Sequence, residues 1–493
     1  MSTTLEKNKA PHEAKLVHLN MSAVTPPAVS PIMEFLRGQA ATALSASLGG
    51  LPLVNFNTGG LGNFPYYYTD PRTTNFNIST YNWINTNVLS NNAPIQQSSG
   101  SYFSNQVLSV LSKIQYSLSV ADQAALNAAK SNATNQQLAV LQAWQANMGP
   151  FPTGTGNPID NIMTTIASTW ATPATSLYAI QTSVNLRALL NNAPASGQTI
   201  LPVVVSYLNA LGASVALSNA VLMNNSYVAM ALAALQTPTA ANGGFLTNDG
   251  TGKYYPAYNV STPLPTIISN LQSGSNPISI SMNVSIANAS EYSVSIQGGT
   301  AFNIPFGGFF GLSVGGNASY FHDEIVQNSS SVNVQMTFTG ATIVNFSPAP
   351  FNQATQQNWF WMQPILEAIR NGQQDVSGYK FAVAPGIDFS ANGPFGLLQG
   401  VAMTNYPSAV ITIKSSNYQS IQTTFQQTVS TSVSFLGIPL GGGSESTYSH
   451  SASSSASDST VVITLNPPPS MVAGTSTSSV GWIMGVQTNY PVQ

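Results

Sequence analysis

The sequence predicts an α+β fold, in which an N-terminal helical bundle is followed by an elongated, mostly antiparallel β-domain with two long hairpins. Three observations predict this fold. Apolar residues recur at helical spacing within residues 101–272. A run of small and turn-forming residues at 273–277 then changes the composition. From there to residue 493, apolar and polar residues alternate with the period of a β-strand.

Two segments precede the helices. Residues 1–60 are expected to form a partly extended leader that ends in a glycine-rich turn. Residues 1–20 mix both signs of charge and contain no long apolar run, so they are not predicted to be a signal peptide. Residues 61–100 form an aromatic, Asn-rich loop segment with a tyrosine triplet at 66–68. Buried packing is the expected role of these rings, and an exposed surface for a sugar or a protein is the alternative.

The helical domain is predicted over residues 101–272. Its first apolar stripe is Val107, Leu108, Leu111, Ile114 and Leu118. Ser119, with Asp122 three residues later, predicts the start of an alanine-rich helix, and Gly149-Pro150 predicts its end. Further helices are expected over 159–170, 176–190 and 200–235. We expect four to six helices in one antiparallel bundle.

One part of this domain raises the question of a membrane span. The stretch from Ile200 to Met223 carries no charge and is long enough to cross a bilayer. It also contains Pro202, Asn209 and Asn219, and its apolar density is modest. These features favour a buried helix hairpin over a transmembrane helix.

The β-domain is predicted over residues 273–493. Ile278, Ile280, Met282, Val284 and Ile286 alternate with polar residues. The same alternation returns near residues 292–296, 332–338 and 429–435. One short helix is expected to interrupt the strands, from Pro364 to Arg370.

Two segments of the β-domain share the pattern apolar-x-Ile-Pro-apolar-Gly-Gly. They are residues 302–308 and 436–442, and each follows a strand rich in Ser and Thr. Because proline blocks strand pairing and glycine permits positive φ, the chain is expected to reverse at each motif. The sequence therefore predicts two hairpins with apolar turns.

The apolar residues of these turns are the candidate membrane-contact residues. Amphipathic strands of low charge can line an aqueous lumen on one face and touch lipid on the other. Elongated soluble β-domains also need alternating strands, so an apolar turn that packs into a core is the alternative. The candidates are Phe302, Ile304, Pro305, Phe306, Phe309, Phe310, Leu312, Leu436, Ile438 and Leu440.

The region Thr423–Thr475 resembles the Ser/Thr-rich region of the aerolysin-like pore-forming toxins, in particular the epsilon-toxin and mosquitocidal-toxin branch. The matching features are the alternating strand Thr428–Phe435, the Ile438-Pro439 step with its glycine run, the serine-rich strand Ser444–Thr460, the run Val461–Leu465 and the turn Pro467–Pro469. The likeness is looser over residues 273–493, and the helical half departs from the family. The resemblance implies an elongated β-domain, oligomerisation, and one amphipathic hairpin that refolds into a transmembrane barrel.

Composition excludes several classes of function. The 493 residues include only 12 Lys and Arg and 15 Asp and Glu, where an average protein has about 25% charged residues. Without a basic cluster, nucleic acid is not expected as a partner. Without cysteine, thiol catalysis, disulfides and Cys-based metal sites are excluded. No catalytic residues, metal or cofactor are predicted, and the chain is not expected to be an enzyme.

One cluster of ionisable residues stands out in the β-domain. His322, Asp323 and Glu324 are consecutive and form the candidate pH-sensitive site. A solvated turn, or a strand edge guarded by charge, is the alternative.

The sequence therefore predicts a self-associating, membrane-active protein similar to β-pore-forming toxins. Its expected partners are other copies of itself and a membrane lipid or surface receptor. We expect it to be secreted or released without a classical signal peptide and then to act at a target membrane. The alternative is a structural protein that forms a lattice, filament or crystal through its charge-poor surface. A carbohydrate-binding surface protein is a third interpretation, and it rests on residues 61–100.

Overall fold

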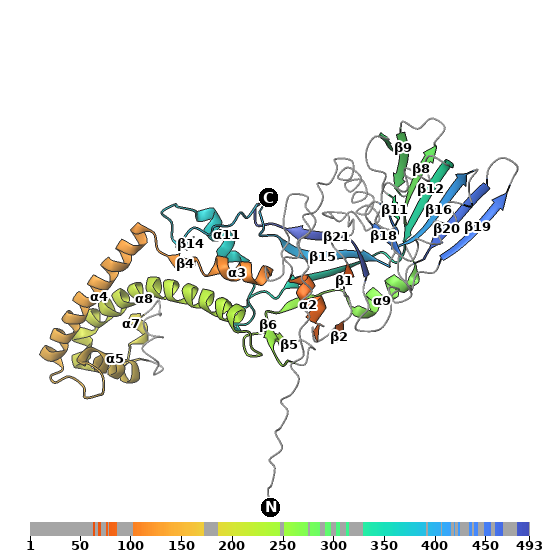
Figure 1. Cartoon of the computed structure of the whole chain (residues 1–493). Helices are drawn as coiled ribbons and strands as arrows, with labels where there is room; N and C mark the ends of the chain where they lie inside the picture. The colour runs from red at the N-terminus through yellow and green to blue at the C-terminus, as the bar shows by residue number, and fades with distance from the viewer. Residues whose placement is uncertain are drawn as a thin grey trace, which may run out of the picture.

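Figure 1 shows the computed structural model of the chain. The structure describes residues 63–64, 68–70, 75–76, 78–85, 102–171, 186–246, 251–274, 277–285, 291–296, 302–305, 312–314, 329–390, 393–405, 407–415, 419, 423, 433–435, 438–441, 448–454, 459–466 and 481–492. The fold is mixed α and β, and its named strands pair antiparallel, which confirms the predicted class. The described elements form an elongated molecule with a helical arm at one end, a central body and a large sheet at the other end.

The arm is built from helices whose starts are encoded locally. Its elements are α4 (Val120–Asn147), α5 (Pro158–Thr169), α7 (Leu186–Leu189) and α8 (Ala195–Gln236). The Ser119 side chain accepts a hydrogen bond of 3.0 Å from the Asp122 backbone N–H, which confirms the predicted N-terminus of α4. Asn157 caps α5 in the same way through the Asp160 N–H, at 3.0 Å.

The arm has a well-packed head and a thin neck. In the head, α5 and the N-terminal part of α8 pack against the end of α4, and the Trp144 and Trp170 rings stack with centroids 5.8 Å apart. In the neck, α4 buries residues spaced by seven, Leu126, Ala133 and Val140, which form a narrow seam of the coiled-coil type. The neck therefore consists of two paired helices.

The helices predicted for one bundle divide between the arm and the body. Helices α3 (Phe103–Leu111) and α9 (Leu264–Ser273) contribute buried residues to the core of the body. Ile114–Ser117, which the apolar stripe assigned to a helix, forms strand β4 instead and pairs with β14 (Gly378–Phe381). The side chain of Asn225 on α8 accepts from the Tyr116 N–H at 2.8 Å and donates to its C=O at 3.0 Å. These long-range bonds stabilise the strand against the local helical preference.

The central body combines a five-stranded sheet with short helices. The strand order is β1 (Asn63–Phe64), β21 (Gly481–Asn489), β15 (Leu397–Thr404), β13 (Thr342–Pro348) and β7 (Tyr258–Val260). Helices α2 (Ile78–Ile84) and α11 (Met362–Asn371) contribute to the same core. Tyr81 and Trp83 are buried, so these two rings of the aromatic segment pack into the core. The remaining short strands are β2 (Tyr68–Asp70), β3 (Asn75–Phe76), β5 (Phe245–Leu246) and β6 (Tyr254–Tyr255).

A buried amide joins three segments of the body. The side chain of Asn85 is 2% exposed. Its Nδ2 donates to Ser104 Oγ at 2.9 Å and to Tyr81 Oη at 3.3 Å. Its Oδ1 accepts from the Ser104 backbone N–H at 3.1 Å and from the Tyr258 hydroxyl at 2.6 Å. A buried polar group is stable only when it is bonded in this way.

The large sheet at the far end has seven strands. Their order is β10 (Phe302–Pro305), β9 (Glu291–Ile296), β8 (Ile278–Ser285), β12 (Ser329–Phe338), β16 (Ser408–Ser415), β20 (Ser459–Leu465) and β19 (Tyr448–Ser454). In β12, Val332, Val334 and Met336 are buried while Gln335 is exposed, so the predicted period-two alternation is confirmed there. A separate three-stranded sheet contains β11 (Leu312–Val314), β17 (Val433–Phe435) and β18 (Ile438–Gly441).

Candidate functional site

The proline of each repeated motif lies in an edge strand, and the residues after Pro305, at which the first reversal is predicted, lie outside the described residues. Pro305 ends β10, at one edge of the large sheet, and stands opposite Glu291. Pro439 lies in β18, at one edge of the small sheet, and stands opposite Ser434. Proline has no backbone N–H to donate, so an edge strand can hold it without losing a ladder bond.

The second reversal comes earlier than the sequence indicated. Phe435 stands opposite Ile438, so the chain turns between these two residues, before the proline and the glycine run. Strand β18 therefore already carries the motif back along β17. The following serine-rich segment enters the large sheet as β19, which pairs with β20.

The small sheet joins the two motif-bearing segments. Strand β11, which follows the first motif, pairs with β17, which precedes the second. Leu312 stands opposite Phe435, Ser313 opposite Ser434, and Val314 opposite Val433. We call β11, β17 and β18 the junction sheet. The repeated motif hinted at a shared role, but a pairing between segments so distant in the sequence could not be derived from it.

The predicted membrane-contact residues divide between two sheets. Leu312, Ile438 and Leu440 lie in the junction sheet, and Phe302, Ile304 and Pro305 lie in β10 of the large sheet. The other predicted site residues lie outside the described residues: Phe306, Phe309, Phe310, Leu436, His322, Asp323 and Glu324.

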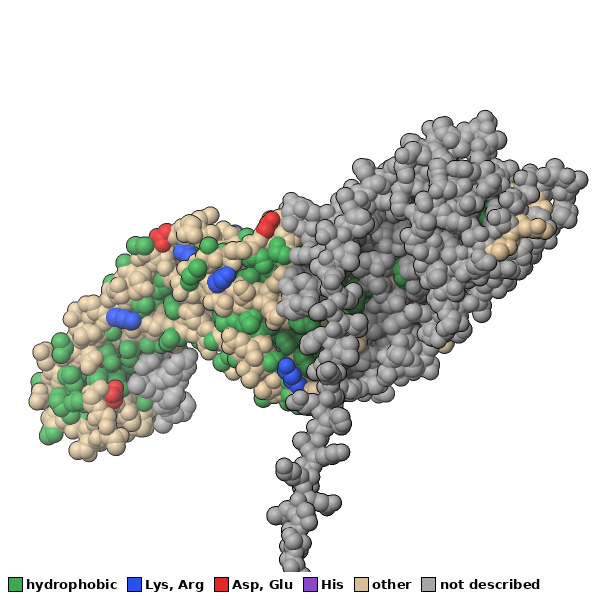
Figure 2. Space-filling view, in the orientation of Figure 1, with side chains coloured by type: hydrophobic (Ala, Val, Ile, Leu, Met, Phe, Trp, Pro, Cys, Tyr) green, Lys and Arg blue, Asp and Glu red, His purple; other side chains and the backbone are tan. Residues whose placement is uncertain are grey.

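The described strands of these two sheets carry almost no formal charge. Glu291 in β9 and Lys414 in β16 are the only Asp, Glu, Lys or Arg residues within them. Figure 2 shows the charged side chains of the arm and body as isolated points among uncharged atoms. Such a surface produces little long-range repulsion between copies of the chain.

Helix α8 is a second candidate for membrane contact. It is the one described helix long and apolar enough to cross a bilayer, with a mean hydropathy of 1.9 in its most apolar window. Only 39% of that window is buried. Further along the helix, Leu222 and Met223 are 67% and 53% exposed. The sequence favoured a buried helix hairpin here, but the structure has a single long helix. This helix packs mainly against α4 and leaves other side chains exposed.

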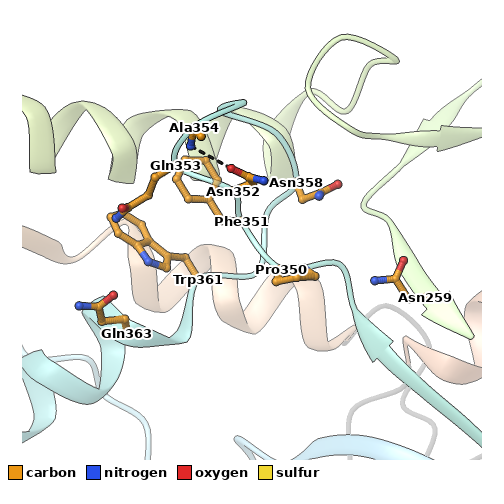
Figure 3. Close-up of a pocket in the computed structure, with 9 residues that line it drawn as sticks. All are labelled: Asn259, Pro350, Phe351, Asn352, Gln353, Ala354, Asn358, Trp361 and Gln363. Atoms are coloured by element: carbon orange, nitrogen blue, oxygen red, sulfur yellow. Dashed lines mark hydrogen bonds between the residues drawn. The ribbon is translucent and has the colours of Figure 1, made fainter. Parts of the chain in front are cut away.

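The body contains a pocket that the sequence did not predict. Its volume is about 610 Å³, and we call it the amide pocket (Figure 3). The lining residues are Asn259, Pro350, Phe351, Asn352, Gln353, Ala354, Asn358, Trp361 and Gln363. The amide-rich loop between Pro350 and Trp361 was a signal in the sequence, but Asn259 reaches the pocket from a strand far away along the chain.

Among the ionisable groups that the structure describes, those with clearly shifted pKa values are tyrosines. Burial raises the pKa of Tyr81 and Tyr258 well above the usual range, and the charges of neighbouring tyrosines add to the effect. Burial and the carboxylate of Glu367 raise the pKa of Tyr379. Glu367 accepts a hydrogen bond from the Tyr379 backbone N–H at 3.2 Å. Within the described part of the chain, no group of three His, Cys, Asp or Glu residues could hold a metal ion.

Comparisons with protein-family models, with curated proteins and with solved structures found no match to this chain.

Proposed function

We propose that this protein is a self-associating, membrane-active protein that acts like a β-pore-forming toxin and is not an enzyme. One observation carries the proposal: strands β11 and β17, which adjoin the two repeated apolar motifs, pair in the junction sheet. The two segments are thereby held together in the soluble fold. Their separation would free the second segment and the end of the first segment, whose strands β9 and β10 also pair in the large sheet.

Each segment is long enough to form a transmembrane hairpin. Two membrane-spanning strands of about 9–11 residues and a turn need about 20–25 residues. The sequence is free of Asp, Glu, Lys and Arg from Tyr292 to His322 and from Ser415 to Ser444. In this proposal, the two long hairpins form from these runs when they insert into the membrane. The helices in the head of the arm form the helical bundle.

Only short strand pairings hold the two segments together in the junction sheet. Strand β11 meets β17 over three residue pairs, and β17 meets β18 over three. A typical hydrogen bond contributes about 0.5–1.5 kcal/mol net. The free energy of pairing in the junction sheet is therefore small compared with the free energy gained when the phenylalanine-rich segment buries its apolar area in lipid. Insertion of the first segment also requires β9 to leave β8, which it meets over four residue pairs.

Dye leakage from liposomes tests the proposal. Replacing Phe309 and Phe310 by Asp should abolish leakage, because the tip of the first hairpin must enter the apolar core of the bilayer, where a charged side chain is destabilising. A matched control replaces the exposed apolar residues Leu366 and Val383 by Asp, which should leave leakage unchanged. Undiminished leakage from the Phe309→Asp, Phe310→Asp protein would remove the first hairpin from the mechanism.

A structural lattice protein is the second candidate. It is favoured by β19, an edge strand of the large sheet that contains no Asp, Glu, Lys or Arg to block pairing with another copy. Electron microscopy of the purified protein distinguishes the two functions. A lattice protein assembles without lipid, whereas a pore-forming protein changes from a soluble form to rings when liposomes are added.

A further inference from the structure

We infer that the amide pocket binds a neutral carbohydrate, at the hexose or N-acetylhexosamine end of a glycan. Its volume of about 610 Å³ lies within the range of small-molecule sites, about 300–1,000 Å³. Five of its lining residues carry a side-chain amide, and none carries a charge. The inference concerns the body of the protein and is independent of membrane insertion.

The loop that forms one wall of the pocket is fixed by its own backbone. The Asn352 N–H donates to the Gln357 C=O at 2.9 Å, and the Phe351 N–H donates to the Phe360 C=O at 2.9 Å. The Asn352 Oδ1 accepts from the N–H groups of Ala354 at 2.9 Å and Thr355 at 3.1 Å. A loop held in this way loses little entropy when a ligand binds.

The same loop adopts a backbone conformation that is unfavourable for its residues. Gln356 and Asn358, with φ of 58° and 69°, are the non-glycine residues of positive φ in the described part of the chain. The Asn358 N–H donates to the Asn242 C=O at 2.9 Å. A Cβ on the neighbouring Gly243 would lie 2.8 Å from the Asn358 nitrogen, so only glycine permits this approach. Such strain persists where the surroundings impose it, and it is often found at ligand sites.

The wall presents unused hydrogen-bonding groups. Asn259, Gln353 and Gln363 are exposed, and their side-chain amides have no hydrogen bond to another described residue. Each amide offers two N–H donors and a carbonyl acceptor. A sugar hydroxyl both donates and accepts, so amides on opposite sides of the pocket can bond to hydroxyls without any net charge.

Two buried aromatic rings support the wall between these amides, since Trp361 is 6% exposed and Phe351 is 8% exposed. Figure 3 shows the Trp361 ring between Gln353 and Gln363. Trp361 packs against Phe351, with ring centroids 5.1 Å apart, and Pro350 adds a further apolar side chain to the wall. The exposed ring of Pro350, supported by these buried aromatic rings, offers an apolar contact for the C–H groups of a pyranose.

The absence of charge restricts the ligand. Carboxylated or sulfated sugars are normally bound by Arg or Lys, and none lines the pocket. Binding should therefore be selective for neutral glycans and should not weaken in salt.

The test uses the full-length protein on an array of glycans ending in galactose, glucose, mannose or an N-acetylhexosamine, with sialylated and sulfated counterparts. Bound glycans are then titrated in free form and as glycolipids in vesicles. The test variant carries Gln353→Ala and Gln363→Ala. Its matched control carries Gln373→Ala and Gln374→Ala, which are exposed glutamines beyond the end of α11 and outside the pocket.

We expect binding to at least one neutral class, no change in 1 M NaCl, and at least a tenfold loss in the test variant with none in the control. Free glycan should compete with vesicle-borne glycan, which would show that the sugar and not the bilayer is recognised. The inference is overturned if no neutral glycan binds, if only anionic glycans bind, if free glycan does not compete, or if the test variant retains full affinity. Leakage from glycan-free liposomes is measured separately, so the two proposals can fail independently.

Discussion

The substitution Asn85→Ala should strongly destabilise the body, because it removes the one side chain that links three buried segments. Its Oδ1 accepts hydrogen bonds from the Tyr258 hydroxyl and from the Ser104 N–H. Tyr258 is 1% exposed and Ser104 is 5% exposed, so water cannot replace the lost acceptor without rearrangement.

The magnitude follows from these two donors. A buried polar group left without a partner costs about 1–3 kcal/mol. Two such groups, with the cavity left by the side chain, give an expected loss of about 3–5 kcal/mol. Since a typical domain is stable by about 5–15 kcal/mol, the midpoint of unfolding in urea should fall clearly.

The assay is urea unfolding followed by tryptophan fluorescence, compared with the control Asn147→Ala. Asn147 is exposed and makes one side-chain hydrogen bond, to the Ala143 C=O at 2.9 Å. The control should change the free energy of unfolding by less than about 1 kcal/mol. If Asn85→Ala unfolds at the same urea concentration as the control, the reasoning about the buried amide is wrong.

Three further predictions concern pH, the arm and assembly. Stability should vary little between about pH 4 and 9 and fall above pH 10, because unfolded tyrosines then ionise while Tyr81 and Tyr258 in the fold keep their protons. At pH 11 the two buried tyrosines should together lower the free energy of unfolding by about 3 kcal/mol. A melting temperature that drops by more than about 15 °C between pH 4 and 9 would contradict the expected constancy in that range. Leu222→Asp with Met223→Asp, at exposed positions of α8, should leave liposome leakage intact. A charged residue at the centre of a transmembrane helix costs about 3 kcal/mol, so loss of leakage from a folded double variant would indicate that α8 inserts. The oligomer should have the same size by light scattering at low salt and in about 1 M NaCl, and dissociation in salt would show that charge pairs hold it.

Local signals in the sequence predicted the boundaries of individual elements. Ser119 marked the start of α4 because its hydroxyl can reach a free N–H of the first turn. Gly274 lies in the run where the sequence predicted the change to β, and it ends α9, a helix that the sequence had not predicted, with a φ of 60°. The predicted alternation of buried and more exposed residues in β12 is confirmed, because one face of the sheet is buried.

Long-range pairing explains what could not be predicted. Ile114–Ser117 is a strand because Asn225 and β14 satisfy its backbone, and neither is near it in the sequence. Pro439 indicated a turn, but the position of an edge depends on which strands assemble. The amide pocket likewise combines Asn259 with the loop at 350–361, and only the folded chain brings them together.

A reversible lock on the junction sheet tests the central claim most directly. The chain has no cysteine, so Ser313→Cys with Ser434→Cys introduces a single disulfide between the opposed strands β11 and β17. The control disulfide, Ser279→Cys with Thr337→Cys, joins β8 to β12, where the two Oγ atoms are 3.4 Å apart.

Liposome leakage is then measured for both proteins before and after reduction. If the two segments must separate to insert, the oxidised Ser313→Cys, Ser434→Cys protein should bind liposomes without releasing dye, and reduction should restore release. The control should release dye in both states. Full leakage from the oxidised junction lock would contradict the claim that these hairpins form the pore.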